Sequence, residues 1–224
     1  MNGAAVRRRG VLAGLASAGL SAFSGPRAGR AATLPEDRHF AVFRKGERIG
    51  RHAATFRSTA VGLAVRHEID LTVRFAFVPI YRYRQDAEDL WHDGRLVASE
   101  AETDDNGART SVRVRERGGR LRCEGPKGVL EAALGTMTDL SYWNPAIVRQ
   151  RGLIDSRLGE VAPLVMAGGA NETIEIDGRP VAARRWQMNP QGAEGGEVWY
   201  DEAGRIVKAV VRTRGEVLDY RLIV

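Results

Sequence analysis

The chain has 224 residues, of which 43% are hydrophobic and 28% charged, which excludes a disordered, collagen-like or polytopic membrane protein. Its single cysteine excludes an intrachain disulfide and a cysteine-rich metal cage. The net charge is +6, but residues 1–31 hold five arginines and no acid, and the remaining 29 basic residues face 28 acidic ones. We therefore expect no nucleic-acid partner, because binding to phosphates needs a basic surface.

Residues 1–31 have the pattern of a cleavable export signal. A basic segment ends at Arg9, a weakly apolar stretch covers 11–23, and small residues lead to a cleavage position after Ala31. The Arg8-Arg9 pair resembles the twin-arginine pattern, with an ordinary secretory signal as the alternative. The stretch is shorter than the roughly 20 residues that span a bilayer. We expect a periplasmic or secreted protein that meets the export machinery through this signal and has no stable membrane anchor.

The rest of the chain, 32–224, is predicted to be a single β-rich domain. Its clearest element is 63–78, where seven of the eight side chains on one parity are apolar and His67 is the exception. The other parity is mainly charged or small. This alternation predicts one long antiparallel strand with one buried face, ending before Pro79. A strand of this length is expected to bend or to contain a bulge.

Turn residues divide the domain into hairpins. Pairs such as Asp93-Gly94, Asn106-Gly107 and Asp177-Gly178 stand between alternating segments and favour tight turns. Further strands are predicted at 39–44, 50–58, 80–91, 95–103, 109–117, 120–124, 172–177, 180–188, 196–200, 205–213 and 216–223. Because open sheets rarely exceed about ten strands, we expect a strongly curved antiparallel meander or an incomplete barrel.

Residues 130–168 break the alternation. Their irregular apolar pattern predicts one or two short helices and a connecting loop across the mouth of the sheet. Thr136, Thr138 or Asp139 could cap one helix, and Asn144-Pro145 could begin another, since proline suits the first helical turn.

No established catalytic or metal-binding motif is present in the sequence. The four histidines (His39, His52, His67 and His92) share no chelating spacing, so no metal and no cofactor are predicted. His67 is interpreted as a hydrogen-bonded core histidine, and Cys123 as a half-buried structural residue. Asp104-Asp105-Asn106-Gly107 lacks the spacing of a calcium loop and is interpreted as a turn.

Three carboxylates lie close together in the strand predicted at 80–91. Asp86 and Glu88 share one face of this strand, whereas Asp89 points to the other. We interpret the group as a solvated acidic edge rather than a catalytic pair.

Aromatic residues give the best indication of a binding site. Tyr83 and Trp91 share one face of the strand predicted at 80–91, and Tyr142, Trp143 and Asn144 follow one another in the segment over the mouth. Amphipathic rings of this kind can line a pocket for an apolar ligand, with their polar atoms orienting it. We predict these five as ligand-binding residues, although such rings can also form the core of a curved sheet.

Short motifs recur along the chain at its turns and aromatic residues: Gly46-x-x-Ile49-Gly50, Tyr81-x-Tyr83, Glu88-x-x-Trp91-x-x-Gly94-x-Leu96, Thr103 before Asn106-Gly107, Tyr142-Trp143-Asn144 and Trp199-Tyr200-Asp201-x-x-Gly204. With these motifs the chain resembles a family of exported bacterial proteins that carries only a domain-of-unknown-function label. More distantly, the sheet is similar to the LolA/LolB-like half-barrel of lipoprotein carriers, whose concave face holds acyl chains. The resemblance implies a fold and supplies no catalytic residues.

The sequence therefore favours a monomeric exported protein that holds a hydrophobic or amphipathic molecule, a lipid or a partner segment in a concave apolar face. One alternative is a periplasmic enzyme acting on envelope lipid or glycan, with Glu88 or Asp201 near a histidine. Another is a structural or partner-binding module whose core is filled.

Overall fold

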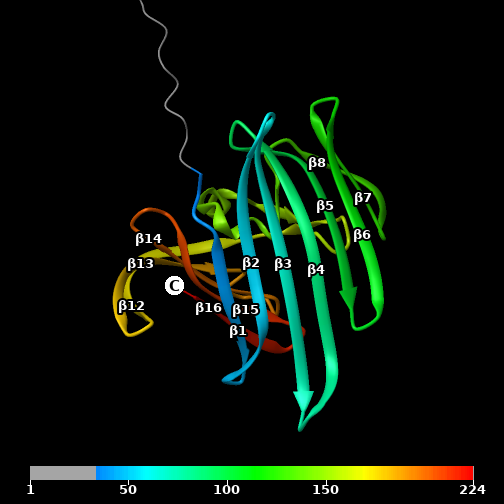
Figure 1. Cartoon of the computed structure of the whole chain (residues 1–224). Coiled ribbons are helices and arrows are strands. Elements are labelled where there is room, and N and C mark those ends of the chain that lie inside the picture. Colours follow the sequence, from blue (N-terminus) through cyan, green and yellow to red (C-terminus); the bar gives the residue numbers. More distant parts are fainter. Residues whose placement is uncertain (1–33, 224) are drawn as a thin grey trace, which may run out of the picture. The chain divides into compact units, whose positions relative to one another are not determined.

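The computed structural model describes residues 34–223, so the predicted export signal lies outside the described residues. One antiparallel sheet of thirteen strands dominates the fold (Figure 1). Its strands in chain order are β1 (Arg38–Arg44), β2 (Glu47–Thr59), β3 (Gly62–Phe75), β4 (Val78–His92), β5 (Arg95–Asp105), β6 (Ala108–Arg117), β7 (Arg120–Gly125), β8 (Gly128–Ala133), β12 (Met166–Ile176), β13 (Arg179–Met188), β14 (Gly195–Asp201), β15 (Ile206–Thr213) and β16 (Glu216–Leu222).

Two meanders build this sheet, β1 to β8 and β12 to β16. They join where β16 pairs with β1, for example at Phe40 and Leu222. The resulting order runs from β12 through β16 and β1 to β8, and β8 and β12 are edges that do not pair with each other. The sheet is thus strongly curved but not closed into a barrel, which confirms the predicted fold class.

Strand β3 shows why the alternating pattern produces this architecture. Leu63, Val65, Ile69 and Leu71 face the concave side, and Arg66 stands exposed on the convex side. The predicted irregularity is a bulge between Val73 and Arg74.

The end of this strand was predicted wrongly. The chain reverses at Ala76 and Phe77, before Pro79, which already belongs to β4. The alternation of apolar and polar or small residues continues through the turn, so it does not show where the strand ends. The turn depends on the positive φ of 53° at Ala76, which an alanine in the sequence does not predict.

The segment that was predicted as helical is mixed. Its helices are two short 3₁₀ elements, η1 (Ser141–Trp143) and η2 (Pro145–Arg149). A small sheet of β9 (Met137–Thr138), β10 (Gly152–Ile154) and β11 (Val161–Pro163) flanks them. We call residues 137–164 the plug, because its buried residues Ile147 and Ile154 pack into the main core cluster. No helix within residues 34–223 is long and apolar enough to cross a membrane.

The prediction that residues 130–168 contain only short helices and a connecting loop was also wrong at the start of this segment. Residues 128–133 form β8, which pairs with β7 and makes one edge of the large sheet. Only Ala132 is buried in this strand, so an apolar alternation that would have predicted it is missing.

The caps of the plug differ in part from those predicted. None of Thr136, Thr138 and Asp139 caps η1, which begins after Leu140 without a side-chain cap. Thr138 is buried, and its hydroxyl bonds to Asp89 instead. The prediction for Pro145 is confirmed, since it occupies the first turn of η2.

Replacing Asn144 with alanine is expected to lower the free energy of unfolding by about 1 kcal/mol. The Asn144 Oδ1 accepts a hydrogen bond of 3.0 Å from the Ala146 amide at the start of η2, and alanine removes that acceptor. Urea denaturation of wild type and variant checks this, and Asn144→Asp, which keeps an acceptor, should stay within about 0.5 kcal/mol of wild type.

The core occupies only part of the concave side. Its main cluster contains the fully buried Val114, Leu121 and Ile147, with Trp91 and Cys123 beside them. Cys123 is fully buried rather than half-buried as predicted, and burial raises the pKa of its thiol, which agrees with a structural role for this residue. Around Ile69 and Leu71 a smaller cluster continues, and the space next to it is not filled by side chains.

Candidate functional site

A cavity of about 820 Å³ lies against the concave face of the sheet. Strands β1 to β4, β15 and β16 supply most of its wall, the plug supplies much of the rest, and the segment from Met188 to Gly195 completes it with Arg214. The wall is mainly apolar and includes Phe40, Ile49, Ile69, Leu71, Leu153 and Leu218. A volume of this size falls in the range of ligand pockets.

Two histidines stand next to each other in this apolar wall. The rings of His52 on β2 and His67 on β3 have centroids 5.8 Å apart, and the Tyr220 ring lies 6.0 Å from His52. His67 is completely buried, and neither of its nitrogens has a hydrogen-bond partner among the described residues; the same holds for His52 Nε2. The prediction of a core histidine was right about burial and wrong about hydrogen bonding.

Both histidines are held in the neutral form. Burial lowers the pKa of His52 to about 4, and burial with the neighbouring His52 lowers the pKa of His67 well below its ordinary value. A neutral imidazole carries one donor and one acceptor. The pair can therefore hydrogen-bond an uncharged polar group of a molecule in the cavity, reached by rotation of the rings.

The plug adds oxygen groups to the same wall. Burial and the nearby Asp155 raise the pKa of Asp139 to about 7, although the Ser156 amide donates to it at 3.0 Å. Burial also raises the pKa of Tyr220 to about 12 and that of Tyr142 further. The cavity therefore offers phenol groups that stay neutral at neutral pH, beside charged side chains such as Arg38, Arg44 and Arg214 that also line it.

Buried hydrogen bonds fasten the plug to the sheet. Gln85 of β4 donates to Ser156 Oγ at 2.9 Å, and the Tyr200 hydroxyl of β14 donates to the Tyr142 carbonyl at 2.8 Å. The Thr138 hydroxyl donates to Asp89 Oδ2 at 2.9 Å. These bonds position Tyr142 and its neighbours over the cavity.

Asp89 corrects part of the predicted acidic edge. Asp86 and Glu88 are exposed on the convex face, as expected, but Asp89 is fully buried. Burial raises its pKa to about 6, opposed by hydrogen bonds from Ser99 and Thr138. The sequence pattern showed that Asp89 faces inward, but it could not show the hydroxyls that make burial tolerable.

Ion pairs join the two walls of the curved sheet beside the cavity. Arg214, in the turn between β15 and β16, donates to Asp105 of β5 at 2.6 Å, and the Tyr81 hydroxyl donates to the same carboxylate at 2.6 Å. Arg44 of β1 pairs with Glu216 of β16 at 2.5 Å. The turn with Asp105 and Asn106 is the tight hairpin predicted, with Asn106 at φ 54°.

Three of the five predicted ligand-binding residues line the cavity, and the other two do not. Tyr83, Tyr142 and Trp143 line the cavity. Trp91 is buried behind it, edge-on to Trp143 with ring centroids 5.2 Å apart, and Asn144 caps η2.

Comparison with models of protein families shows to which family the chain belongs. The model of DUF6134, a domain of unknown function, matches residues 40–223. The chain belongs to the DUF6134 family. No curated protein matches it. A solved structure does share the fold of this DUF6134 protein: the crystal structure of a beta-barrel-like protein of the domain of unknown function DUF1849 from Brucella abortus. The two are 12% identical with a TM-score of 0.58, and the match covers 85% of this chain and 96% of the other.

The structure of this DUF6134 protein does not bring together the residues that were candidates for catalysis. Glu88 pairs with Arg57 on the convex face, and Asp201 at the end of β14 pairs with Arg205, with five strands between β14 and β4 in the sheet. His92 faces the Val61 carbonyl at 2.8 Å in another turn. Within residues 34–223 no group of three His, Cys, Asp or Glu side chains is placed to hold a metal ion.

Sequence reasoning missed the histidine pair of this DUF6134 protein. His52 and His67 are fifteen positions apart, and only the register of β2 on β3, in which Ala54 pairs with His67 and His52 with Ile69, makes them diagonal neighbours. His52 shares the inward parity of Ala54 and Phe56, which is the signal that could have shown it.

Proposed function

We propose that this DUF6134 protein binds an amphipathic molecule, with an apolar chain and an uncharged polar head, in the cavity against its concave sheet. The observation that carries the proposal is the histidine pair: His52 and His67 line a mainly apolar cavity wall, and three of their four ring nitrogens are buried without a hydrogen-bond partner among the described residues. A buried polar group without a partner costs about 1–3 kcal/mol, so a wall that serves only packing would favour leucine there.

Affinity for such a ligand would come mainly from the apolar wall. Burying about 250 Å² of an acyl chain yields about 6 kcal/mol before the costs of association, at about 25 cal/mol per Å². The histidine pair would accept and donate hydrogen bonds to a hydroxyl, amide or protonated carboxyl group. A cationic head is disfavoured, because both rings are neutral and Arg38, Arg44 and Arg214 stand at the cavity.

The proposal includes export to the periplasm through residues 1–31, where a soluble carrier of envelope lipids would have its ligands. The expected similarity to lipoprotein-carrier half-barrels supports it at the level of fold alone. Catalysis is not part of the proposal, since the residues considered for it are separated.

Binding is tested first with protein taken from the periplasm of the producing cell. Native mass spectrometry should show a co-purifying apolar ligand, and after its removal dansyl-labelled undecanoic acid should bind with a blue-shifted emission. Filling the cavity should weaken this binding: Ala54→Phe places a phenyl group into the wall of β2, and the dissociation constant should rise about tenfold.

Thr55→Phe is the matched control, because residue 55 follows 54 on the same strand, is only half-buried and does not line the cavity, and its affinity should stay within about twofold of wild type. Equal affinity of both variants, or no probe binding by wild type, would contradict the proposal.

A further inference from the structure

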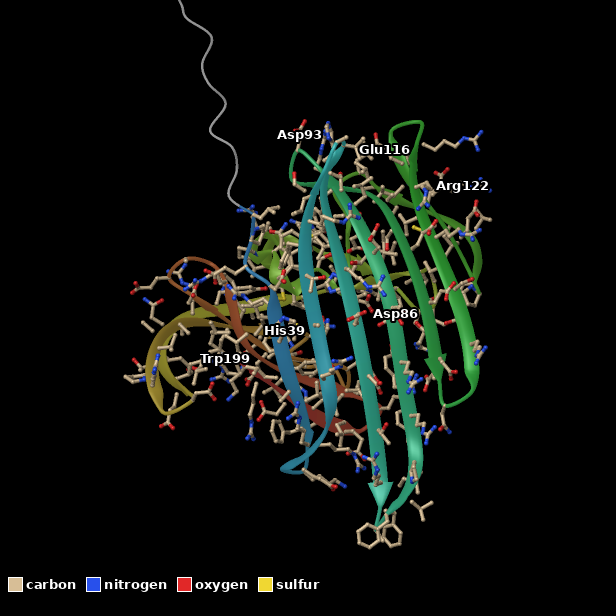
Figure 2. All side chains as sticks on the ribbon, in the orientation of Figure 1. His39, Asp86, Asp93, Glu116, Arg122 and Trp199 are labelled. Carbon is tan, nitrogen blue, oxygen red and sulfur yellow. The ribbon has the colours of Figure 1, made fainter. Side chains whose placement is uncertain are left out.

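The hairpin between β3 and β4 ends in an exposed apolar tip. Phe75 is 76% exposed, Phe77 95%, Val78 64% and Ile80 57%, and we call these four residues the tip. In Figure 1 this hairpin projects beyond the other strand ends, and the labelled Asp93 lies at the opposite end of β4 in Figure 2. Two almost fully exposed phenylalanines side by side are unusual on a protein surface and indicate a binding surface.

A cluster of arginines surrounds the base of the same hairpin. A shallow groove on the convex face of β2, β3 and β4 is lined by Arg48, Arg51, Arg74, Arg82 and Arg84, with Asp70 as its one carboxylate. All five arginines are exposed. Arg84 lies 3.5 Å from Asp70, and the other four have no carboxylate within 4 Å among the described residues. We call these five residues the arginine collar.

Further along the same strands the exposed arginines are paired with carboxylates, unlike most of those in the arginine collar. Toward the other end of the convex face, Arg57 pairs with Glu88, and Arg66 pairs with both Glu68 and Asp86. The positive charge is therefore concentrated behind the tip, although residues 32–224 as a whole are nearly neutral.

We propose that the tip and the arginine collar dock this protein on an anionic lipid surface. Phenyl rings and aliphatic side chains at the point of a narrow hairpin can enter the boundary between headgroups and acyl chains, as in other peripheral proteins. Each arginine near an anionic bilayer is attracted to the negative headgroups, so the collar would hold the inserted tip. A protruding two-residue turn offers little flat area for a protein interface, whereas a lipid surface accommodates it without a matching pocket.

The docked hairpin would lie next to the cavity. Ile80 of the tip and Tyr81 behind it also line the cavity wall. The lipid surface would thus meet the protein at an end where the cavity is near, although docking does not require a bound ligand.

Vesicle sedimentation tests the proposal with purified protein, wild type and variants in the same N-terminal form. Wild type should bind vesicles of 7:3 phosphatidylcholine and phosphatidylglycerol, and Phe75→Ser with Phe77→Ser should weaken binding about tenfold. Arg74→Ser with Arg82→Ser should weaken it by a similar factor and reduce its salt dependence. The matched control is Val61→Ser with Val129→Ser, which removes two exposed apolar side chains elsewhere and should leave binding unchanged.

Insertion has its own readout, which does not depend on affinity. Ala76→Cys, labelled with an environment-sensitive fluorophore, should show a blue shift on these vesicles, since Cys123 is buried and stays unlabelled. Asp93→Cys, at a turn of similar φ at the other end of β4, should show none. No vesicle binding by wild type, equal binding by the tip variant, or a shift at residue 93 alone would each overturn the proposal, and would favour a protein partner for the tip.

This proposal stands apart from ligand binding in the cavity. Phe75 and Phe77 do not line the cavity, so the tip variant should bind dansyl-labelled undecanoic acid like wild type. Ala54→Phe should in turn bind vesicles like wild type. Failure of one proposal is therefore visible while the other holds.

Discussion

Replacing His67 with leucine is expected to raise the free energy of unfolding by about 1–3 kcal/mol and to weaken binding of an amphipathic ligand. The side chain of His67 is completely buried, and both ring nitrogens lack a partner within the described residues. A buried polar group without a hydrogen bond costs about 1–3 kcal/mol, and leucine of similar size removes that cost. A gain of 2 kcal/mol would lower the unfolded fraction about thirtyfold.

The same substitution removes half of the polar pair that would orient a ligand head. We expect affinity for dansyl-labelled undecanoic acid to fall about tenfold, the equivalent of one hydrogen bond. The histidine at position 67 would then lower the stability of the fold while it strengthens ligand binding, as is common at binding sites. Urea denaturation and probe titration on the same preparations measure both effects.

His92→Leu is the matched control for this experiment. His92 is an exposed histidine next to a turn, so its replacement should change stability by no more than about 0.5 kcal/mol and leave probe affinity unchanged. A His67→Leu protein that is less stable than wild type would show that His67 has a protein partner in solution, and would remove the main support for the proposed site.

The fold could be predicted from the sequence because its signals are local. The alternation in β3 defines which face is buried, and glycine pairs such as Asn106-Gly107 mark the turns that connect neighbouring strands. Twelve strands in series already require curvature. What alternation could not show was the turn at Ala76 and Phe77, since both residues fit a strand, and the edge strand β8, whose side chains are mostly exposed.

Residues of the site could be predicted from the sequence only where a single strand or segment determines their position. Tyr83 was found from the parity of its own strand, and Tyr142 and Trp143 from their place in the segment over the sheet. The histidine pair depends on the register between β2 and β3, and the role of Asp89 depends on Thr138, which is 49 positions away. Contacts between distant segments follow from the strand register and the curvature of the whole sheet, and no local sequence pattern contains them.

Replacing Asp89 with asparagine is expected to remove a pH dependence of stability worth about 3 kcal/mol. Burial raises the pKa of Asp89 in the folded protein to about 6, whereas the carboxyl has a pKa of 3.8 when exposed. The folded state therefore binds this proton more tightly than the unfolded state does. The contribution of Asp89 to the stability of wild type should fall as the pH rises from 4 through 6, and should level off above 7, where the carboxylate is ionised in both states.

The asparagine variant does not titrate at this position. The difference in free energy of unfolding between the variant and wild type should therefore change by about 3 kcal/mol between pH 4 and pH 7, and the change favours the variant at the higher pH. His52 titrates in the same range with the opposite sign, since its pKa is lowered, but it does so in both proteins and cancels in the difference. Burial and Asp155 raise the pKa of Asp139 to about 7 in both proteins as well, and only the smaller part of its shift that Asp89 causes remains in the difference. Denaturation curves at each pH measure this difference. Asp86→Asn, on the exposed face of the same strand, should show a difference below about 0.5 kcal/mol throughout.

A flat difference for Asp89→Asn between pH 4 and pH 7 would mean that the buried carboxyl keeps one protonation state, against the assignment made from its burial. The expected slope has a structural consequence, because Asp89 is bound to Thr138 of the plug. Ionisation costs the folded state energy at the point where the plug is fastened to β4. The plug should therefore be held most firmly in mildly acidic solution, and hydrogen exchange of amides in residues 137–143 should slow as the pH falls from 7 to 5, after correction for the intrinsic exchange rate.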